Sequence, residues 1–169
     1  MSDRQIIFLD FDGPLCTNAT YAAWHALGHF NAGIVGEQED HLLFCPKAVA
    51  NLNWILANCP KAEVVLSTAW RELAPMETLC DILRRAGVER MPADRTPVYI
   101  SRRMSEHNLR EREIVEWLLA NRDVETDNVL VIDDEPMSGA LYDRAIRPLD
   151  GLRDGHVERA LRLTEAWGA

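Results

Sequence analysis

The stretch Gln5-Ile-Ile-Phe-Leu-Asp-Phe-Asp-Gly-Pro14 decides the fold class. Its continuous apolar run is typical of a strand that is buried on both faces, as in the middle of a parallel sheet. Two carboxylates, Asp10 and Asp12, follow that run, and Gly13 then interrupts it. Acids at the end of a buried strand are costly unless a partner neutralises them, and a bound cation is the usual partner. The stretch therefore predicts a functional site as well as a strand.

The rest of the chain alternates between strand-like and helix-like segments. Beyond the opening strand, short apolar runs predict strands over 63–68, 128–134 and 145–149, with weaker candidates over 88–91 and 97–100. Apolar residues at helical spacing predict helices over 21–27, 47–58, 73–83, 108–119 and 157–164. This alternation predicts an α/β protein, a Rossmann-like three-layer sandwich with a mainly parallel five-stranded sheet.

Length and charge limit the classes of function. The 169 residues predict a single domain over 1–169, and the aperiodic stretch over 14–45 predicts a loop or small cap inserted into it. A net charge of −9 argues against a general nucleic-acid coat. Sixteen of the 18 basic residues are arginine, and eight of these lie within 84–112. That local excess is either solvated surface or a patch that faces an anion.

The four cysteines show no paired spacing, and no apolar run approaches membrane-spanning length. Because the sequence also lacks a signal-peptide pattern, we expect a cytoplasmic protein without disulfides and without a membrane partner.

Polar side chains follow three of the predicted strands. Because parallel strands share one carboxyl edge, we expect these side chains to form one site. Clustered carboxylates raise one another's pKa unless a hard cation lies among them, and Mg²⁺ prefers oxygen ligands together with a substrate phosphate. In such a site one carboxylate can attack phosphorus while another handles the proton of the leaving group. The residues concerned are Asp10, Asp12, Ser67, Thr68, Asp133 and Asp134.

Three motifs in this order resemble those of the haloacid-dehalogenase-like (HAD) superfamily. Leu9-Asp-Phe-Asp-Gly13 is similar to its first motif, Val64-Val-Leu-Ser-Thr68 to its second, and Val131-Ile-Asp-Asp134 to its fourth. The resemblance implies a Mg²⁺-dependent phosphohydrolase that passes through an aspartyl-phosphate. The substrate would be a small phosphorylated compound or a nucleotide.

The resemblance also implies a role for each residue. Asp10 would be the nucleophile and Asp12 the general acid/base, and Thr68, or Ser67 in the alternative register, would bind the phosphate. Asp133 and Asp134 would hold Mg²⁺ together with Asp10 and the backbone carbonyl of Asp12. The third motif differs, because no lysine precedes the fourth strand at the usual place. Arg110 is the first candidate for that cation and Arg112 the second, although arginine is not equivalent to lysine at a phosphate.

Further short motifs resemble a small HAD subgroup that is associated with RNA-repair proteins. These are Ser67-Thr-Ala-Trp-Arg71, Arg95-Thr-Pro97, Arg110-Glu-Arg-Glu-Ile114 and Asp150-Gly-Leu152. This resemblance implies a minimal cap and an open site, in which Arg71 is either a contact for substrate phosphate or a surface arginine at a helix start. Gly13 and Trp70, which adjoin the proposed catalytic groups, are further candidates for substrate binding.

Three functions remain in competition. The first is a phosphomonoesterase that acts through Asp10 and Asp12. The second is an RNA or DNA end phosphatase, which the local arginine excess favours and the acidic net charge disfavours. The third is a non-catalytic module that binds phosphate or a partner, for which the missing lysine is the main support.

Overall fold

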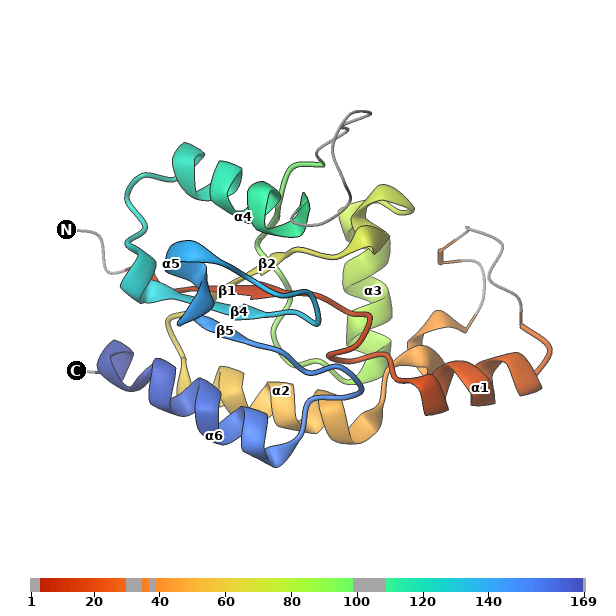
Figure 1. Cartoon of the computed structure of the whole chain (residues 1–169). Coiled ribbons are helices and arrows are strands. Elements are labelled where there is room, and N and C mark those ends of the chain that lie inside the picture. Colours follow the sequence, from red (N-terminus) through yellow and green to blue (C-terminus); the bar gives the residue numbers. More distant parts are fainter. Residues whose placement is uncertain (1–3, 30–34, 37–38, 99–108, 169) are drawn as a thin grey trace.

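The computed structural model describes residues 4–29, 35–36, 39–98 and 109–168. Its centre is a parallel sheet in the order β3-β2-β1-β4-β5, with helices on both faces (Figure 1). The predicted α/β sandwich with a parallel five-stranded sheet is therefore confirmed. The strands are β1 (Ile6–Leu9), β2 (Glu63–Leu66), β3 (Asp94–Arg95), β4 (Val129–Ile132) and β5 (Ala145–Ile146).

Two apolar clusters lie on opposite faces of the sheet. Helices α2, α3 and α6 pack on one face, and α4 and α5 pack on the other, which gives three layers. The α-helices are α1 (Asn18–Ala26), α2 (Pro46–Asn58), α3 (Met76–Ala86), α4 (Leu109–Ala120), α5 (Gly139–Tyr142) and α6 (Asp154–Leu163). Short 3-10 helices are η1 (Asp40–Leu43), η2 (Ala69–Glu72), η3 (Thr126–Asn128) and η4 (Glu165–Gly168).

Strand β1 lies in the middle of the sheet because both of its faces are apolar. Ile7 and Leu9 enter one apolar cluster, and Ile6 and Phe8 enter the other. This division follows from the alternation of side chains along a strand. No residue of β1 is more than 1% exposed.

The register of β1 aligns the ends of the central strands. Leu9 pairs with Leu66 of β2 on one side and with Ile132 of β4 on the other. The residues that follow these three positions therefore emerge side by side at the carboxyl edge of the sheet. Strand order reverses at this point, where ligands bind in open α/β sheets.

Some predicted strands were wrong. The segment over 88–91 is not a strand, because the Val88 N–H bonds back to the Leu83 carbonyl at the end of α3 and cannot pair with β2. The third strand is instead the two-residue β3. Residues 97–98 are also not extended in the sheet, and the remainder of 97–100 lies outside the described residues. The strand predicted over 145–149 ends at Ile146, two residues before Pro148.

The helices differ from the predicted ones mainly at their starts. Helix α1 begins at Asn18, earlier than predicted, because the side chain of Thr17 caps it in a reciprocal pair with Thr20. Helix α3 begins at Met76, because Pro75 occupies its N-cap and η2 precedes it. The start predicted for α4 at residue 108 lies outside the described residues.

The predicted insertion over 14–45 contains α1 and η1 in its described part, and these contact each other beside α3 (Figure 1). The division into one domain with a small cap stays a prediction. All four cysteines are free thiols. Within the described ranges, no helix is both long enough and apolar enough to span a bilayer.

Candidate active site

Three carboxylates gather where β1 and β4 end. The N–H of Asp10 donates to the Ile132 carbonyl at 2.9 Å, so Asp10 lies directly beside the residues that follow β4. One oxygen from each of Asp10, Asp133 and Asp134 lies within 4.8 Å of the other two. Asp10 and Asp133 are buried, and Asp134 is half-buried. The tertiary structure thus brings together three of the four acids that the sequence singled out.

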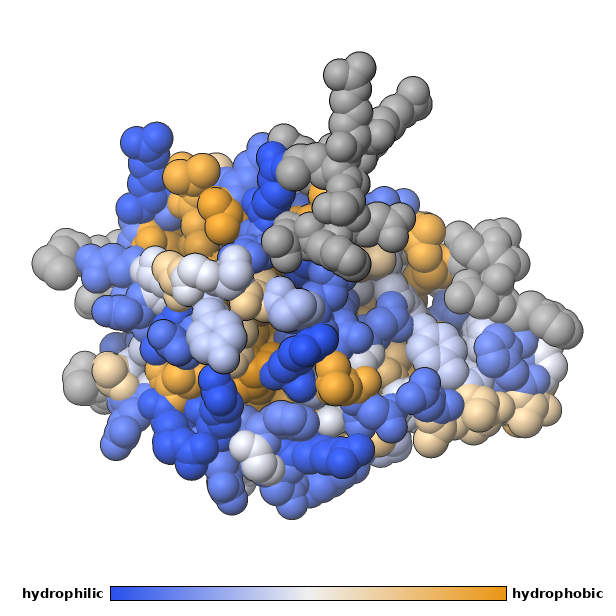
Figure 2. Space-filling view, in the orientation of Figure 1, coloured by the Kyte–Doolittle hydropathy of each residue, from blue (hydrophilic) through white to orange (hydrophobic). Residues whose placement is uncertain are grey.

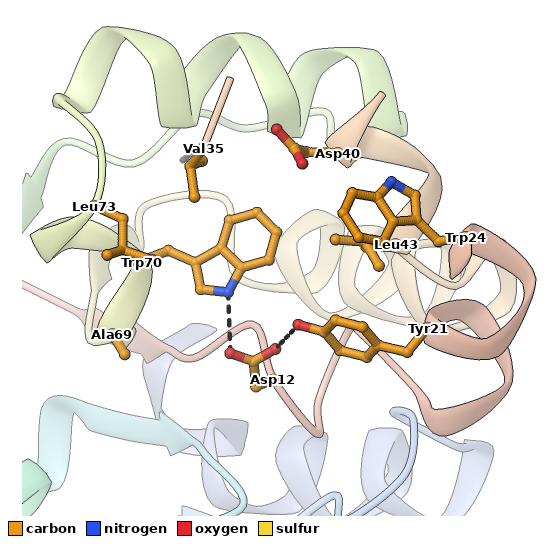
Figure 3. A pocket seen from close by; sticks show the side chains of 9 residues that line it. All are labelled: Asp12, Tyr21, Trp24, Val35, Asp40, Leu43, Ala69, Trp70 and Leu73. Carbon is orange, nitrogen blue, oxygen red and sulfur yellow. Dashed lines mark hydrogen bonds between the residues drawn. The ribbon is translucent and has the colours of Figure 1, made fainter. Parts of the chain in front are cut away.

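The fourth acid, Asp12, faces a different direction. Its Oδ1 accepts a hydrogen bond of 2.6 Å from the Tyr21 hydroxyl, and its Oδ2 accepts one of 3.0 Å from Trp70 Nε1 (Figure 3). Its side chain therefore does not join the three-carboxylate cluster. This separation suits a side chain that carries a proton rather than one that ligates a cation.

Burial makes the cluster electrostatically unfavourable when it is ionised. Burial raises the pKa of Asp10 to about 7, although Arg110 and the Phe11 N–H act in the opposite direction. Burial and the neighbouring Asp10 raise the pKa of Asp133 to about 8. Burial together with neighbouring acids also raises the pKa of Asp134. A cation among these groups would remove the repulsion.

Of the two arginines predicted for this role, Arg110 reaches the cluster. Its Nε lies 3.3 Å from Oδ2 of Asp133, and its side chain is 9% exposed. Burial alone would lower the pKa of Arg110, but the Asp10 and Asp133 carboxylates outweigh burial and raise it. Arg112, two residues further along α4, lines a separate hollow with Val115 and Glu116. Of the two candidates for the missing lysine, Arg110 has the required position.

Thr68 and Ser67 are both fully buried after β2. The Thr68 hydroxyl lowers the pKa of Asp10, so it lies beside that carboxylate. Its oxygen also accepts a hydrogen bond of 3.4 Å from the Trp70 N–H. Ser67 Oγ has no hydrogen-bond partner within the described part of the chain. Thr68 therefore has the position expected of the phosphate-binding hydroxyl.

Arg71 is buried in a structural position, so the alternative of a surface arginine at a helix start was wrong. Its Nε donates to the Thr96 carbonyl at 3.1 Å, and its Nη2 donates to the Pro97 carbonyl at 3.1 Å. A third donor bonds the Thr68 carbonyl, and Nη2 also forms an ion pair with buried Glu113. With its side chain only 1% exposed, Arg71 supports the loop that carries Thr68. A contact with substrate phosphate does not fit this arrangement.

Two supporting residues were missed by the sequence reasoning. Glu113 pairs with Arg71 and also lies 3.4 Å from Nη1 of Arg110, so it ties the two arginines together. The spacing of three residues between Arg110 and Glu113 on a helix is a signal that could have found it. Tyr21 gave no such signal, because its bond to Asp12 depends on how α1 lies against the loop after β1.

Gly13 allows the loop after β1 to approach Asp134. Its φ is +88°, and an added Cβ would lie 2.6 Å from the Asp134 Cβ. Any larger residue would therefore push the Asp134 carboxylate away from the cluster. The Gly13 carbonyl also accepts a hydrogen bond of 2.7 Å from Gly151, within the Asp150-Gly-Leu152 motif. Direct contact between Gly13 and substrate stays a prediction.

The residues at this edge fit a hard divalent cation. The cluster offers only carboxylate oxygens, which Mg²⁺ prefers. Asp133 Oδ2 is buried and has no hydrogen-bond partner among the described residues, so it retains a lone pair for a cation. Because Arg110 is shared by Asp10 and Asp133, its single charge does not balance them.

The comparison with protein families agrees with this geometry. The sequence profile of the family described as "HAD domain in Swiss Army Knife RNA repair proteins" matches residues 6–157. The chain belongs to this family. The match covers all five strands and every acid of the cluster. It confirms the predicted likeness to the HAD domains of RNA-repair proteins. Membership of this HAD family supports a phosphatase-type function in general. Comparisons with curated proteins and with solved structures found no significant match.

Proposed function

We propose that this HAD domain is a Mg²⁺-dependent phosphomonoester hydrolase in which Asp10 is the nucleophile. The observation that carries the proposal is that the four acids occupy two different positions. Asp10, Asp133 and Asp134 converge on one point, whereas Asp12 is held apart by Tyr21 and Trp70. A phosphoryl-transfer site needs both a cation-binding cluster and a separate proton carrier.

The chain's own groups account for the steps of the reaction. The Phe11 N–H donates to Oδ1 of Asp10 at 2.8 Å, which orients this carboxylate and leaves its other oxygen for attack on phosphorus. Asp12 gives a proton to the departing ester oxygen and later takes one from the water that hydrolyses the aspartyl-phosphate. Arg110 and Thr68 offset charge on the transferred group. When bound, Mg²⁺ supplies charge neutralisation between the nucleophile and the phosphoryl group.

The test is hydrolysis of an aryl phosphate with Mg²⁺ and with EDTA, with Asp10→Asn as the matched variant. We expect turnover that requires Mg²⁺ and falls by more than about a thousandfold in Asp10→Asn, because covalent catalysis is lost. Equal rates in the two proteins would contradict the assignment of Asp10. Stabilisation by Mg²⁺ or phosphate without any turnover would favour the non-catalytic module instead.

A second candidate function is removal of phosphate from a nucleic-acid end. The family description refers to RNA repair, and a hollow of about 400 Å³ beside the acids is lined in part by Arg147, Arg159 and Tyr142. Arg147 adjoins the cluster directly, because its Nε donates to the Asp134 carbonyl at 2.6 Å. Figure 2 shows a largely hydrophilic surface over the neighbouring helix α6. A phosphodiester backbone could lie along these cations.

This second candidate predicts a salt-dependent preference for oligonucleotides. At low salt, the enzyme should remove the end phosphate from a 5′- or 3′-phosphorylated oligonucleotide faster than it removes phosphate from mononucleotides. The rate on the oligonucleotide should fall steeply as the salt concentration rises. Arg159→Gln should lower the logarithmic salt slope by about 1, because it removes one phosphate contact. Arg162→Gln is the matched control, since Arg162 lies on the same helix outside the hollow. Equal salt slopes for oligonucleotides and mononucleotides would exclude this function.

A further inference from the structure

A pocket of about 130 Å³ opens beside Asp12, and none of the three clustered carboxylates lines it (Figure 3). It lies between the loop after β2 and the segment that contains α1 and η1. Its lining is aromatic and aliphatic apart from two acids. The lining residues are Asp12, Tyr21, Trp24, Val35, Asp40, Leu43, Ala69, Trp70 and Leu73.

The aromatic walls of the pocket are held in place by their own neighbours. The Trp70 ring packs edge-on against Phe11 at 5.6 Å and against Phe44 at 5.7 Å between ring centroids. Trp24 stacks on His29 with ring centroids 5.1 Å apart. These contacts fix the rings without a ligand. The pocket therefore offers ready-made surfaces for a flat ring, which lowers the entropic cost of binding one.

Two polar groups are buried in the same wall of the pocket. Trp24 is 3% exposed, and its Nε1 donor has no hydrogen-bond partner within the described ranges. Asp40 is also 3% exposed, and its Oδ2 accepts a hydrogen bond of 2.7 Å from the Gly36 N–H. Figure 3 shows the Asp40 carboxylate and the Trp24 nitrogen on the same side of the pocket. Because buried polar groups normally have partners, the Trp24 N–H indicates a ligand with an acceptor. Asp40 can accept a further hydrogen bond from a donor on the same ligand.

We propose that this pocket binds the nucleobase of a nucleotide substrate, and that a pyrimidine with an amino group fits it best. Its size suits one six-membered ring, since a cavity of about 150 Å³ in another protein holds benzene. An amino group would donate to Asp40, and a ring acceptor would receive the Trp24 N–H. A plain hydrocarbon ring would leave the Trp24 N–H unpaired, and a sugar would lack a flat face for Trp70.

The location of Asp12 connects this pocket to the reaction. The inference rests on the proposed function, in which Asp12 protonates the departing ester oxygen. Asp12 lines the pocket, and the two residues that bond its carboxylate, Tyr21 and Trp70, form the pocket walls. The group that leaves with that oxygen is therefore the group that enters the pocket. The structure thus assigns base recognition to the leaving-group side of the site.

The experiment compares substrates that differ by the base. The value of kcat/KM is measured for cytidine 5′-monophosphate, cytidine 3′-monophosphate and ribose 5-phosphate. We expect at least one cytidine monophosphate to exceed ribose 5-phosphate by about tenfold or more, because the base adds stacking and two hydrogen bonds. The ratio should fall about fivefold in Trp24→Phe, which removes the N–H donor. Trp54→Phe is the matched control, because Trp54 is 61% exposed and lies outside the pocket.

Further measurements keep the inference testable if Trp24→Phe does not fold or no ester is hydrolysed. Asp40→Asn keeps an acceptor for Gly36 but turns an amide donor toward the amino group, so it should also lower the ratio. Saturation-transfer NMR with cytidine against ribose reads binding without turnover, and we expect transfer to the base protons only. If the esters are hydrolysed but the ratio of kcat/KM for cytidine monophosphate to that for ribose 5-phosphate is the same in the wild type and all variants, base recognition is overturned and the phosphatase assignment stands. Cytidine binding without hydrolysis of any ester would overturn the phosphatase and leave the pocket.

Discussion

Asp10→Asn should stabilise the protein while it abolishes turnover. Burial raises the pKa of Asp10 from 3.8 to about 7, so the ionised carboxylate is less stable in the folded protein than in the unfolded chain. This difference corresponds to at most about 4 kcal/mol above pH 7. Asparagine resembles the neutral acid and can still accept from the Phe11 N–H. We expect Asp10→Asn to raise the free energy of unfolding by about 2 kcal/mol, half of that limit, because an amide reproduces only part of the hydrogen bonding of the protonated acid.

The sign of the pH dependence follows from the direction of the pKa change. Between about pH 4 and pH 7 the folded wild type binds more protons than the unfolded chain, so its stability falls as the pH rises. The stability of Asp10→Asn does not fall in this way, because asparagine does not titrate. The extra stability of Asp10→Asn over the wild type should therefore be complete above about pH 7 and shrink as the pH falls toward 4.

The assay is thermal unfolding with EDTA at about pH 8, where 2 kcal/mol corresponds to a rise in Tm of about 4–8 °C. Asp143→Asn is the matched control, because Asp143 is exposed on the surface and should change stability by less than about 0.5 kcal/mol. Saturating Mg²⁺ should raise the Tm of the wild type more than that of Asp10→Asn, since the variant has lost one carboxylate of the cluster. A lower Tm for Asp10→Asn in EDTA would refute the reasoning, because Asp10 would then stabilise the fold as a carboxylate.

Three more predictions concern residues around the cluster. Gly13→Ala should destabilise the protein by about 1–2 kcal/mol and weaken Mg²⁺ binding, because its φ is +88° and its Cβ would displace Asp134; an unchanged Mg²⁺ titration of the Tm would contradict this. Arg110→Lys should lower kcat for an aryl phosphate by about tenfold or more, since the planar guanidinium fork is lost, whereas Arg112→Lys should change kcat by less than about twofold. Similar losses in both variants would refute Arg110 as the cation that replaces the usual lysine. Tyr21→Phe should slow hydrolysis of an alkyl phosphate by about tenfold and that of a nitrophenyl phosphate much less, because only the poor alkoxide leaving group needs a proton from Asp12, which Tyr21 holds in place. Equal effects on both esters would count against Asp12 as the proton carrier.

The sequence by itself determined the central layer and its chemistry. An apolar run that is buried on both faces is typical of a central strand, and in-register parallel neighbours must deliver their next residues to one edge. For this reason the amino-acid pattern alone was enough to expect Asp10 and Asp133 to be neighbours. Membership of the HAD family was equally visible, because its motifs are local.

Only the tertiary structure decided which polar groups face which partner. A two-residue strand such as β3 has no periodicity to detect, so it was missed. Arg71 lies beside the hydroxyl motif in sequence, yet it is bound by Glu113 and by three backbone carbonyls. Asp12 follows Asp10 by two residues, but Tyr21 and Trp70 turn it toward the pocket. Local sequence sets which side chains reach the edge of the sheet, and contacts between distant segments set their direction.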